Sequence, residues 1–90
     1  MKNPLLLPDA PIFTMRPNPV GEQVLVVVAD WQEDVVTVML VTDLAGRQVF
    51  TQTLTSSLTN LNIGNLPSGL YLVRLTRNGK SIATQKLVKY

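Results

Sequence analysis

The sequence contains no cysteine and no histidine. The chain therefore cannot form a disulfide, ligate haem or build a zinc site from the usual ligands, and it has no imidazole for acid–base catalysis or a Ser-His-Asp triad. Charged residues make up only 16% of the chain and aromatic residues 6%, and no apolar run approaches the roughly 18 residues of a membrane span. We expect a protein that is neither an enzyme nor embedded in a membrane, with no metal or cofactor.

The 90 residues, with a mass of 9.9 kDa, correspond to one domain. A chain of this mass buries roughly 64% of its extended surface on folding, which is enough for one modest core. Hydrophobic residues make up 46% of the chain and exclude disorder as the default state. Prolines at positions 4, 8 and 11 favour an extended segment. We therefore predict a linker over residues 1–11 and a folded domain over residues 12–90.

The net charge of +2 is unevenly distributed along the chain. Residues 1–45 carry a net charge of −4, whereas residues 46–90 contain six basic residues and no acidic residue, which gives +6. Such asymmetry suggests a charged contact surface. An outward polar face whose lysines prevent the pairing of sheet edges explains the same pattern, and both interpretations stay open. Nucleic-acid binding is not expected, because no aromatic residues are interleaved with the basic ones for stacking on bases.

Short apolar runs separated by turn residues follow one another at intervals of about 8–12 residues, which is typical of all-β proteins. No stretch of a dozen residues has the apolar spacing of an amphipathic helix. The predicted strands are 12–16, 23–29, 35–42, 48–55, 58–63, 70–77 and 81–89. About seven short strands without a helix must close a core by packing two sheets face to face. The predicted fold is therefore an immunoglobulin-like antiparallel β-sandwich.

Two of the predicted turns have a clear chemical signature. Pro17-Asn18-Pro19 cannot continue a β-ladder, because proline has no N–H to donate. Asn78-Gly79 is the strongest short signal for a hairpin, and it predicts a type I′ turn between the last two strands.

Two of the predicted strands, 23–29 and 35–42, are apolar on both faces. Such strands are usually buried on both sides, whereas a two-layer sandwich buries only one face of each strand. The second face is then either a scattering of surface valines with high β-propensity or an apolar patch with a cover. The candidate covers are a second copy of the chain, a preceding domain and the leucines at positions 5–7. Self-association through the second apolar face of these two strands, which is rich in valine, therefore stays open.

The polar clusters favour no reaction. Asp30, Glu33 and Asp34 surround Trp31 at one predicted loop tip, but a loop tip offers no cleft to hold two carboxylates about 5 Å apart. Their spacing also lacks the alternating oxygen ligands of a calcium loop. Trp31 either stacks on a sugar ring or covers one end of the core. The glycine-containing turns have no following helix and so do not form a phosphate-binding loop.

Several motifs follow one another in a particular order. Pro17-Asn18-Pro19 precedes an apolar strand, and Asp43-Leu44-Ala45-Gly46-Arg47 follows the next one. Leu66-Pro67-Ser68-Gly69-Leu70-Tyr71 leads into the strand before Asn78-Gly79-Lys80, and Lys86-Leu87-Val88-Lys89 stands almost at the C-terminus. In this order the motifs resemble the C-terminal sorting domain (type A tail) of cargo for the bacterial type IX secretion system, over residues 12–90. Tyr71 also fits the tyrosine corner of immunoglobulin-like and fibronectin type III sandwiches.

The resemblance implies that the domain directs a larger cargo protein, attached on its N-terminal side, through an outer-membrane translocon. It implies transit through the periplasm, recognition by the translocon and its shuttle, and removal by a sortase-like protease that attaches the cargo to the cell surface or releases it. The cut is expected within or before residues 1–11. The family commonly has a polar linker there, whereas residues 5–7 are leucines.

We predict that recognition depends on the last hairpin together with the proline loop. Most of the predicted residues shape the fold, whereas Lys80, Lys86 and Lys89 are predicted to contact an acidic partner through their charge. The predicted signal residues are Pro17, Asn18, Pro19, Gly69, Tyr71, Gly79, Lys80, Lys86, Leu87, Val88 and Lys89. Two other functions stay open: a passive immunoglobulin- or fibronectin-like spacer, and a carbohydrate-binding module of an extracellular protein.

Overall fold

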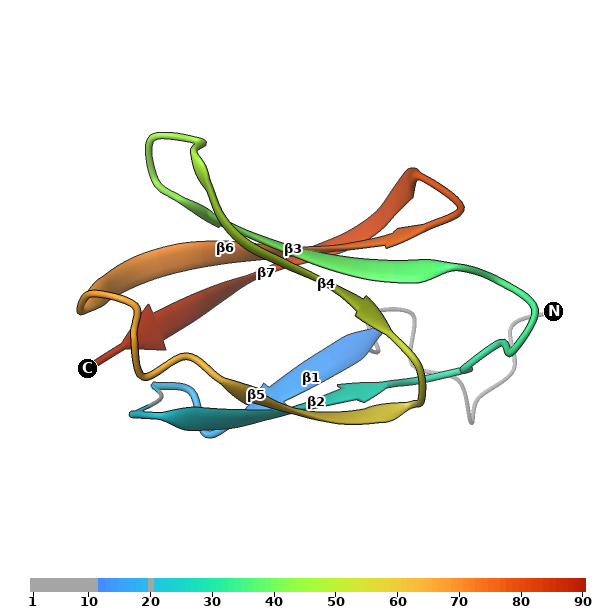
Figure 1. Cartoon of the computed structure of the whole chain (residues 1–90), viewed down its shortest axis with the longest axis horizontal. Helices are drawn as coiled ribbons and strands as arrows, with labels where there is room; N and C mark the ends of the chain where they lie inside the picture. The colour runs from blue at the N-terminus through green and yellow to red at the C-terminus, as the bar shows by residue number, and fades with distance from the viewer. Residues whose placement is uncertain (1–11, 20) are drawn as a thin grey trace, which may run out of the picture.

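The computed structural model describes residues 12–19 and 21–90 (Figure 1). The predicted linker, residues 1–11, lies outside the described residues. In the described part of the chain all seven predicted strands are present and no helix occurs. The strands are β1 (Phe13–Arg16), β2 (Gln23–Val28), β3 (Thr37–Asp43), β4 (Gln48–Leu54), β5 (Leu58–Asn62), β6 (Gly69–Arg77) and β7 (Lys80–Lys89).

The strands form two antiparallel sheets, which are the two layers seen in Figure 1. One sheet has the strand order β1-β2-β5 and the other has the order β4-β3-β6-β7. The first strand, β1, and the last strand, β7, are therefore both edge strands, one in each sheet. The predicted all-β sandwich is confirmed.

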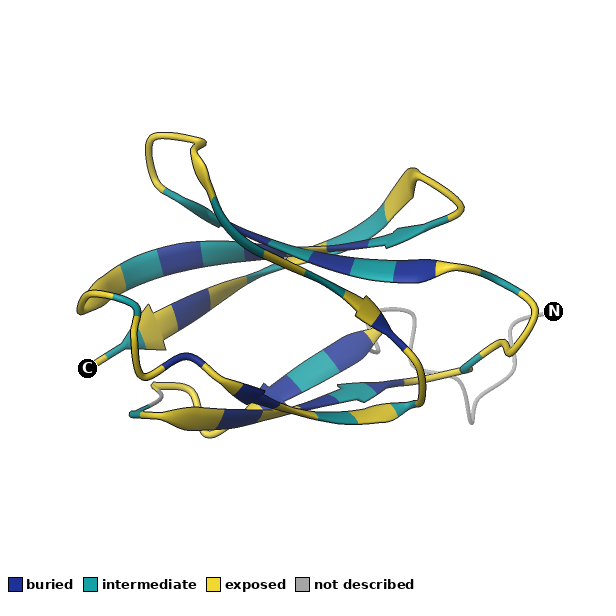
Figure 2. Cartoon of the chain, viewed as in Figure 1, coloured by how far each residue is buried: buried dark blue, intermediate teal, exposed yellow. Residues whose placement is uncertain are grey.

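The core fills the space between the sheets and is built from alternate residues of the strands, because successive side chains of a strand point to opposite faces. This alternation is visible as dark and light bands in Figure 2. Phe13 and Met39 are fully buried. The other buried apolar residues are Met15, Val24, Val26, Val28, Val41, Leu54, Leu61, Ile63, Tyr71, Val73, Leu75 and Leu87.

The two strands that are apolar on both faces bury only one of them. On β2, Val24 and Val26 are buried, whereas Leu25 between them is 37% exposed. On β3, Met39 is buried and its neighbours Val38 and Leu40 are half-buried on the outer surface. The second apolar face is thus a partly exposed surface of each sheet.

The beginning of β3 differs from the prediction, because the strand starts at Thr37 rather than at residue 35. Val36 instead exchanges hydrogen bonds with the hairpin turn between β6 and β7. The backbone N–H of Asn78 donates to the carbonyl oxygen of Val36 at 2.8 Å, and the N–H of Val36 donates to Oδ1 of Asn78 at 3.1 Å. These bonds hold Val36 in the connection between β2 and β3, where it is 57% exposed.

The sandwich has two ends that hold different parts of the sequence (Figure 1). At the hairpin end are Ile12, the connection 29–36 and the Asn78-Gly79 turn, which has the positive φ angles of the predicted type I′ turn, 49° and 82°. At the motif end are the loop 17–19, the turn 43–47, the corner 64–69 and residues 86–89 of β7. The nine residue steps of β7 separate the two ends by about 30 Å.

Candidate recognition surface

The C-terminal motif is an ordered part of β7. Lys86, Leu87, Val88 and Lys89 pair with Leu72, Tyr71, Leu70 and Gly69 of β6, respectively. Leu87 is only 1% exposed and packs in the core, whereas Val88 is 39% exposed and Lys86 is also at the surface. The strand therefore anchors itself through Leu87 and presents its neighbours outward.

The proline loop lies against this same stretch of β7. The side-chain Nδ2 of Asn18 donates to the carbonyl oxygen of Lys86 at 2.9 Å, and Oδ1 of Asn18 accepts from the backbone N–H of Val88 at 3.0 Å. The two motifs are separated by 68 to 70 residues in the sequence. The fold thus joins the first and last motifs of the chain into one surface.

A tyrosine corner positions the beginning of β6 beside the end of β7. Tyr71 is 5% exposed, and its hydroxyl group donates to the carbonyl oxygen of Pro67 at 2.5 Å. Gly69 pairs with Lys89 and has a φ of +156°, with no atom within 4 Å of the position of a Cβ. The backbone conformation, rather than lack of space, favours glycine at this position.

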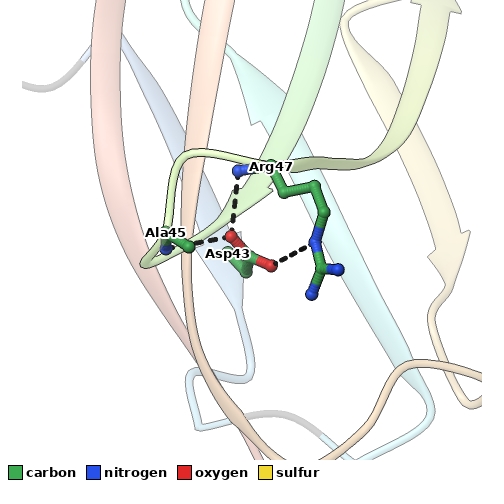
Figure 3. A network of polar contacts seen from close by, with 3 residues as sticks. All are labelled: Asp43, Ala45 and Arg47. Carbon is green, nitrogen blue, oxygen red and sulfur yellow. Dashed lines mark hydrogen bonds and ion pairs between the residues drawn. The ribbon is translucent and has the colours of Figure 1, made fainter.

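The turn 43–47 is organised around one carboxylate (Figure 3). Oδ1 of Asp43 accepts from the backbone N–H groups of Ala45 and Arg47, each at 2.9 Å. Oδ2 accepts from Nε of Arg47 at 3.1 Å. The backbone N–H of Arg47, followed by its guanidinium group, lowers the pKa of Asp43 below its ordinary value. This network explains why the motif places Asp43 and Arg47 four residues apart.

Nine of the predicted signal residues gather at the motif end, and two do not. Gly79 and Lys80 lie in the hairpin turn, about 30 Å along β7 from Lys89. The three predicted lysine contacts therefore do not form one patch. The nine residues at the motif end are Pro17, Asn18, Pro19, Gly69, Tyr71, Lys86, Leu87, Val88 and Lys89.

Gln85, which directly precedes the C-terminal motif, extends this surface along β7, although it is not among the predicted signal residues. Its side-chain Nε2 donates to the carbonyl oxygen of Phe13 in β1, the edge strand of the other sheet. No local pattern marks this residue, because the contact spans 72 positions of the sequence. Only the packing of β1 beside β7 reveals it.

The other sequence candidates, the acidic residues around Trp31, lie at the hairpin end. Residues 12–19 and 21–90 contain no pocket and no group of three or more acidic residues that could hold a metal ion. In the same part of the chain no helix is long and apolar enough to cross a membrane. Trp31 is half-buried and packs against the core, as expected of a tryptophan that covers one end of it.

The chain is thus a small antiparallel β-sandwich in which most of the sequence motifs lie at one end. The chain matches the family model described as "Secretion system C-terminal sorting domain" over residues 14–90, and it belongs to this family. Such a domain is the C-terminal sorting signal of cargo for the type IX secretion system, which delivers proteins to the cell surface or the extracellular space. The family consists of secretion signals rather than known enzymes. Comparison with individually curated proteins finds no match.

Proposed function

We propose that the type IX machinery recognises this domain through its motif end. One observation carries the proposal: four segments from separate parts of the sequence lie together. They are the proline loop, the Asp43–Arg47 turn, the tyrosine corner and the last four residues of β7. Antiparallel topology already brings these connections to one end. The hydrogen bonds of Asn18 to Lys86 and Val88 go beyond it, because they fix the proline loop against the last strand, as a surface recognised by one partner requires.

Within this surface the residues divide into two groups. Leu87 and Tyr71 are buried and shape the end of the sandwich. Lys86 is exposed beside them and Lys89 is half-buried, and their charges favour an acidic surface on the translocon or its shuttle. Lys80 lies at the hairpin end and is outside the proposed contact.

The domain performs no reaction of its own in this proposal. It crosses the periplasm with its cargo, binds the translocon and is then removed by a sortase-like protease that cuts on the N-terminal side of the sandwich. Ile12 lies at the hairpin end, where its carbonyl oxygen accepts from the N–H of Ala29. The chain therefore enters the sandwich at the end opposite the proposed contact surface.

The test is export of a reporter that carries residues 1–90 at its C-terminus and a separate periplasmic targeting signal, in a host with a type IX system. The double variant Lys86→Glu/Lys89→Glu is compared with Lys80→Glu, which reverses a charge at the hairpin end. We expect the double variant to leave at least about tenfold more reporter in the periplasm, because two attractive charges become repulsive, and we expect Lys80→Glu to export normally.

Equal export of the double variant and of Lys80→Glu would contradict a charged contact at the motif end. A single-lysine variant, Lys86→Glu, separates the two positions and keeps the total charge equal to that of Lys80→Glu. Normal export after removal of residues 12–90 would contradict any signal function and favour a passive spacer.

A further inference from the structure

The bond of Gln85 to Phe13 places the edges of β1 and β7 on the same side of the sandwich, but the two strands do not form a ladder with each other in the described part of the chain. Edge strands expose unpaired backbone N–H and C=O groups, which attract strands from other molecules. β7 is the longest of the described strands, with ten residues. This side therefore needs a device that occupies the two edges.

Asn18 occupies part of the β7 edge in the way a neighbouring strand would. A primary carboxamide has one carbonyl acceptor and two N–H donors, so it contains the donor and acceptor of a peptide group. Asn18 uses both: it donates to the carbonyl oxygen of Lys86 and accepts from the N–H of Val88. Lys86 and Val88 direct these groups away from β6, because alternate residues of a strand point their backbone groups to the same edge.

Gln85 provides the complementary contact in the opposite direction. Its side-chain amide, carried by β7, donates to the carbonyl oxygen of Phe13 in β1. Phe13 is fully buried, and Gln85 is half-buried. The β7 edge is thus bound by the carboxamide of Asn18, in the loop that follows β1. The β1 edge is bound by the carboxamide of Gln85, on β7.

We propose that Asn18 and Gln85 form a reciprocal amide clasp and act as positioning residues for the export signal. The clasp fixes the stretch from Lys86 to Val88 at the surface and blocks strand pairing at that part of the edge. The inference rests on the proposed function, because it assumes that the motif end is recognised. It adds that recognition requires an amide at position 18, since no other side chain of similar size donates and accepts in this geometry at neutral pH.

The first test is Asn18→Asp, with Asn60→Asp as its matched control. Asn60 is exposed on β5, so both variants make the same change of charge and shape. A carboxylate at position 18 cannot donate to Lys86 and places a negative oxygen against its carbonyl oxygen. The repulsion should move the carboxylate off the edge, although it keeps an acceptor for Val88. We therefore expect the amide hydrogen of Val88 to exchange about tenfold faster in Asn18→Asp, a factor that corresponds to the loss of one or two hydrogen bonds. The amide of Leu75 in the core should keep its wild-type exchange rate, and Asn60→Asp should change neither.

Export of the reporter fusion provides the functional measurement. We expect Asn18→Asp and Asn18→Ala to lower export severalfold while the core amides stay protected, and Asn60→Asp to be exported normally. Gln85→Glu should also lower export. Its matched control is Gln48→Glu, at the exposed beginning of β4, which should be exported normally. Asn18→Ala introduces no charge, so it keeps the test valid if the aspartate variant unfolds.

Three outcomes would overturn the inference. Unchanged exchange at Val88 in both Asn18 variants means that the clasp does not hold the strand. Faster exchange with normal export means that the clasp has no role in recognition. Loss of protection at both Val88 and Leu75 in Asn18→Ala means that Asn18 stabilises the whole fold rather than one stretch of it. Failure of the proposed function gives a different result. The Lys86 and Lys89 variants are then exported normally, while their exchange rate at Val88 remains that of the wild type.

Discussion

The two ends of the sandwich are closed by different chemistry. At the hairpin end, Nη2 of Arg77 donates to the carbonyl oxygen of Asp30 at 3.1 Å, and Asn78 exchanges hydrogen bonds with Val36. These bonds join the β6–β7 hairpin to the connection that follows β2. Toward the motif end, the bonds of Asn18 and Gln85 join the first strand and its loop to the last strand. One end thus secures a turn, and the other secures the C-terminal strand.

The ends also differ in charge. Asp30, Glu33 and Asp34 lie in the connection 29–36 at the hairpin end, where Arg77 and Lys80 offset part of their charge. At the motif end, the carboxylate of Asp43 is paired with Arg47, and Lys86 and Lys89 stand on the last strand. The contrast teaches that a sandwich can keep the same core throughout and still specialise one end. We therefore expect changes at the two ends to have similar effects on folding and different effects on export.

The largest expected effect comes from the core beneath each end. Leu87→Ala, near the motif end, and Leu75→Ala, nearer the hairpin end, each remove a fully buried side chain and should lower the free energy of unfolding by about 3 kcal/mol. Urea denaturation measures this loss. At equal stability we expect Leu87→Ala to reduce reporter export more, because it also releases the strand that carries Lys86 and Val88. Equal export of the two variants would mean that folding alone determines secretion.

A smaller effect separates the two ends more cleanly. Tyr71→Phe removes the hydrogen bond to Pro67 at the motif end and should lower the free energy of unfolding by about 1 kcal/mol. Gly79→Ala forces a Cβ onto a residue with a φ of 82° at the hairpin end, which should cost about 1–2 kcal/mol. Thermal unfolding and export are measured together. We expect the export of Tyr71→Phe, and not that of Gly79→Ala, to fall further than the loss of stability explains. A larger unexplained loss of export in Gly79→Ala would contradict the assignment of the recognised end.

The smallest effect is expected at the Asp43 turn, which is solvent-exposed. The folded state lowers the pKa of Asp43, so its stabilisation is fully present above the unfolded pKa and disappears as the pH falls through the folded pKa. Asp43→Asn should be slightly less stable than the wild type at about pH 7, and the difference should shrink as the pH falls through the folded pKa of Asp43. Urea midpoints over a series of decreasing pH values measure it. A difference independent of pH would show that the charge of Asp43 contributes nothing.

The sequence predicted the sandwich well because its local signals agree with one another. Prolines at 17 and 19 and the Asn78-Gly79 turn mark where strands stop, and the period-2 pattern of β6 identifies Tyr71, Val73 and Leu75 as core residues, all of which are buried. Tyrosine-corner geometry also followed from the spacing of Pro67 and Tyr71. These features depend on residues that are close in sequence.

The arrangement of the candidate surface could not be predicted in the same way. The three lysines looked equivalent in sequence, but the length of β7 places Lys80 at one end of the sandwich and Lys89 at the other. The contacts of Asn18 and Gln85 depend on two edge strands that meet only after both sheets have formed. Val36 was assigned to a strand because it is β-branched and apolar, whereas its hydrogen bonds to Asn78 keep it in the preceding connection.

The position of Ile12 has a consequence for the layout of this export tag. Because Ile12 is bonded to Ala29 at the hairpin end, the polypeptide enters the sandwich at the pole opposite Lys89. The point of entry and the C-terminal stretch of the last strand are then separated by the length of the tag. A sequence change at the entry leaves the packing of the opposite pole untouched.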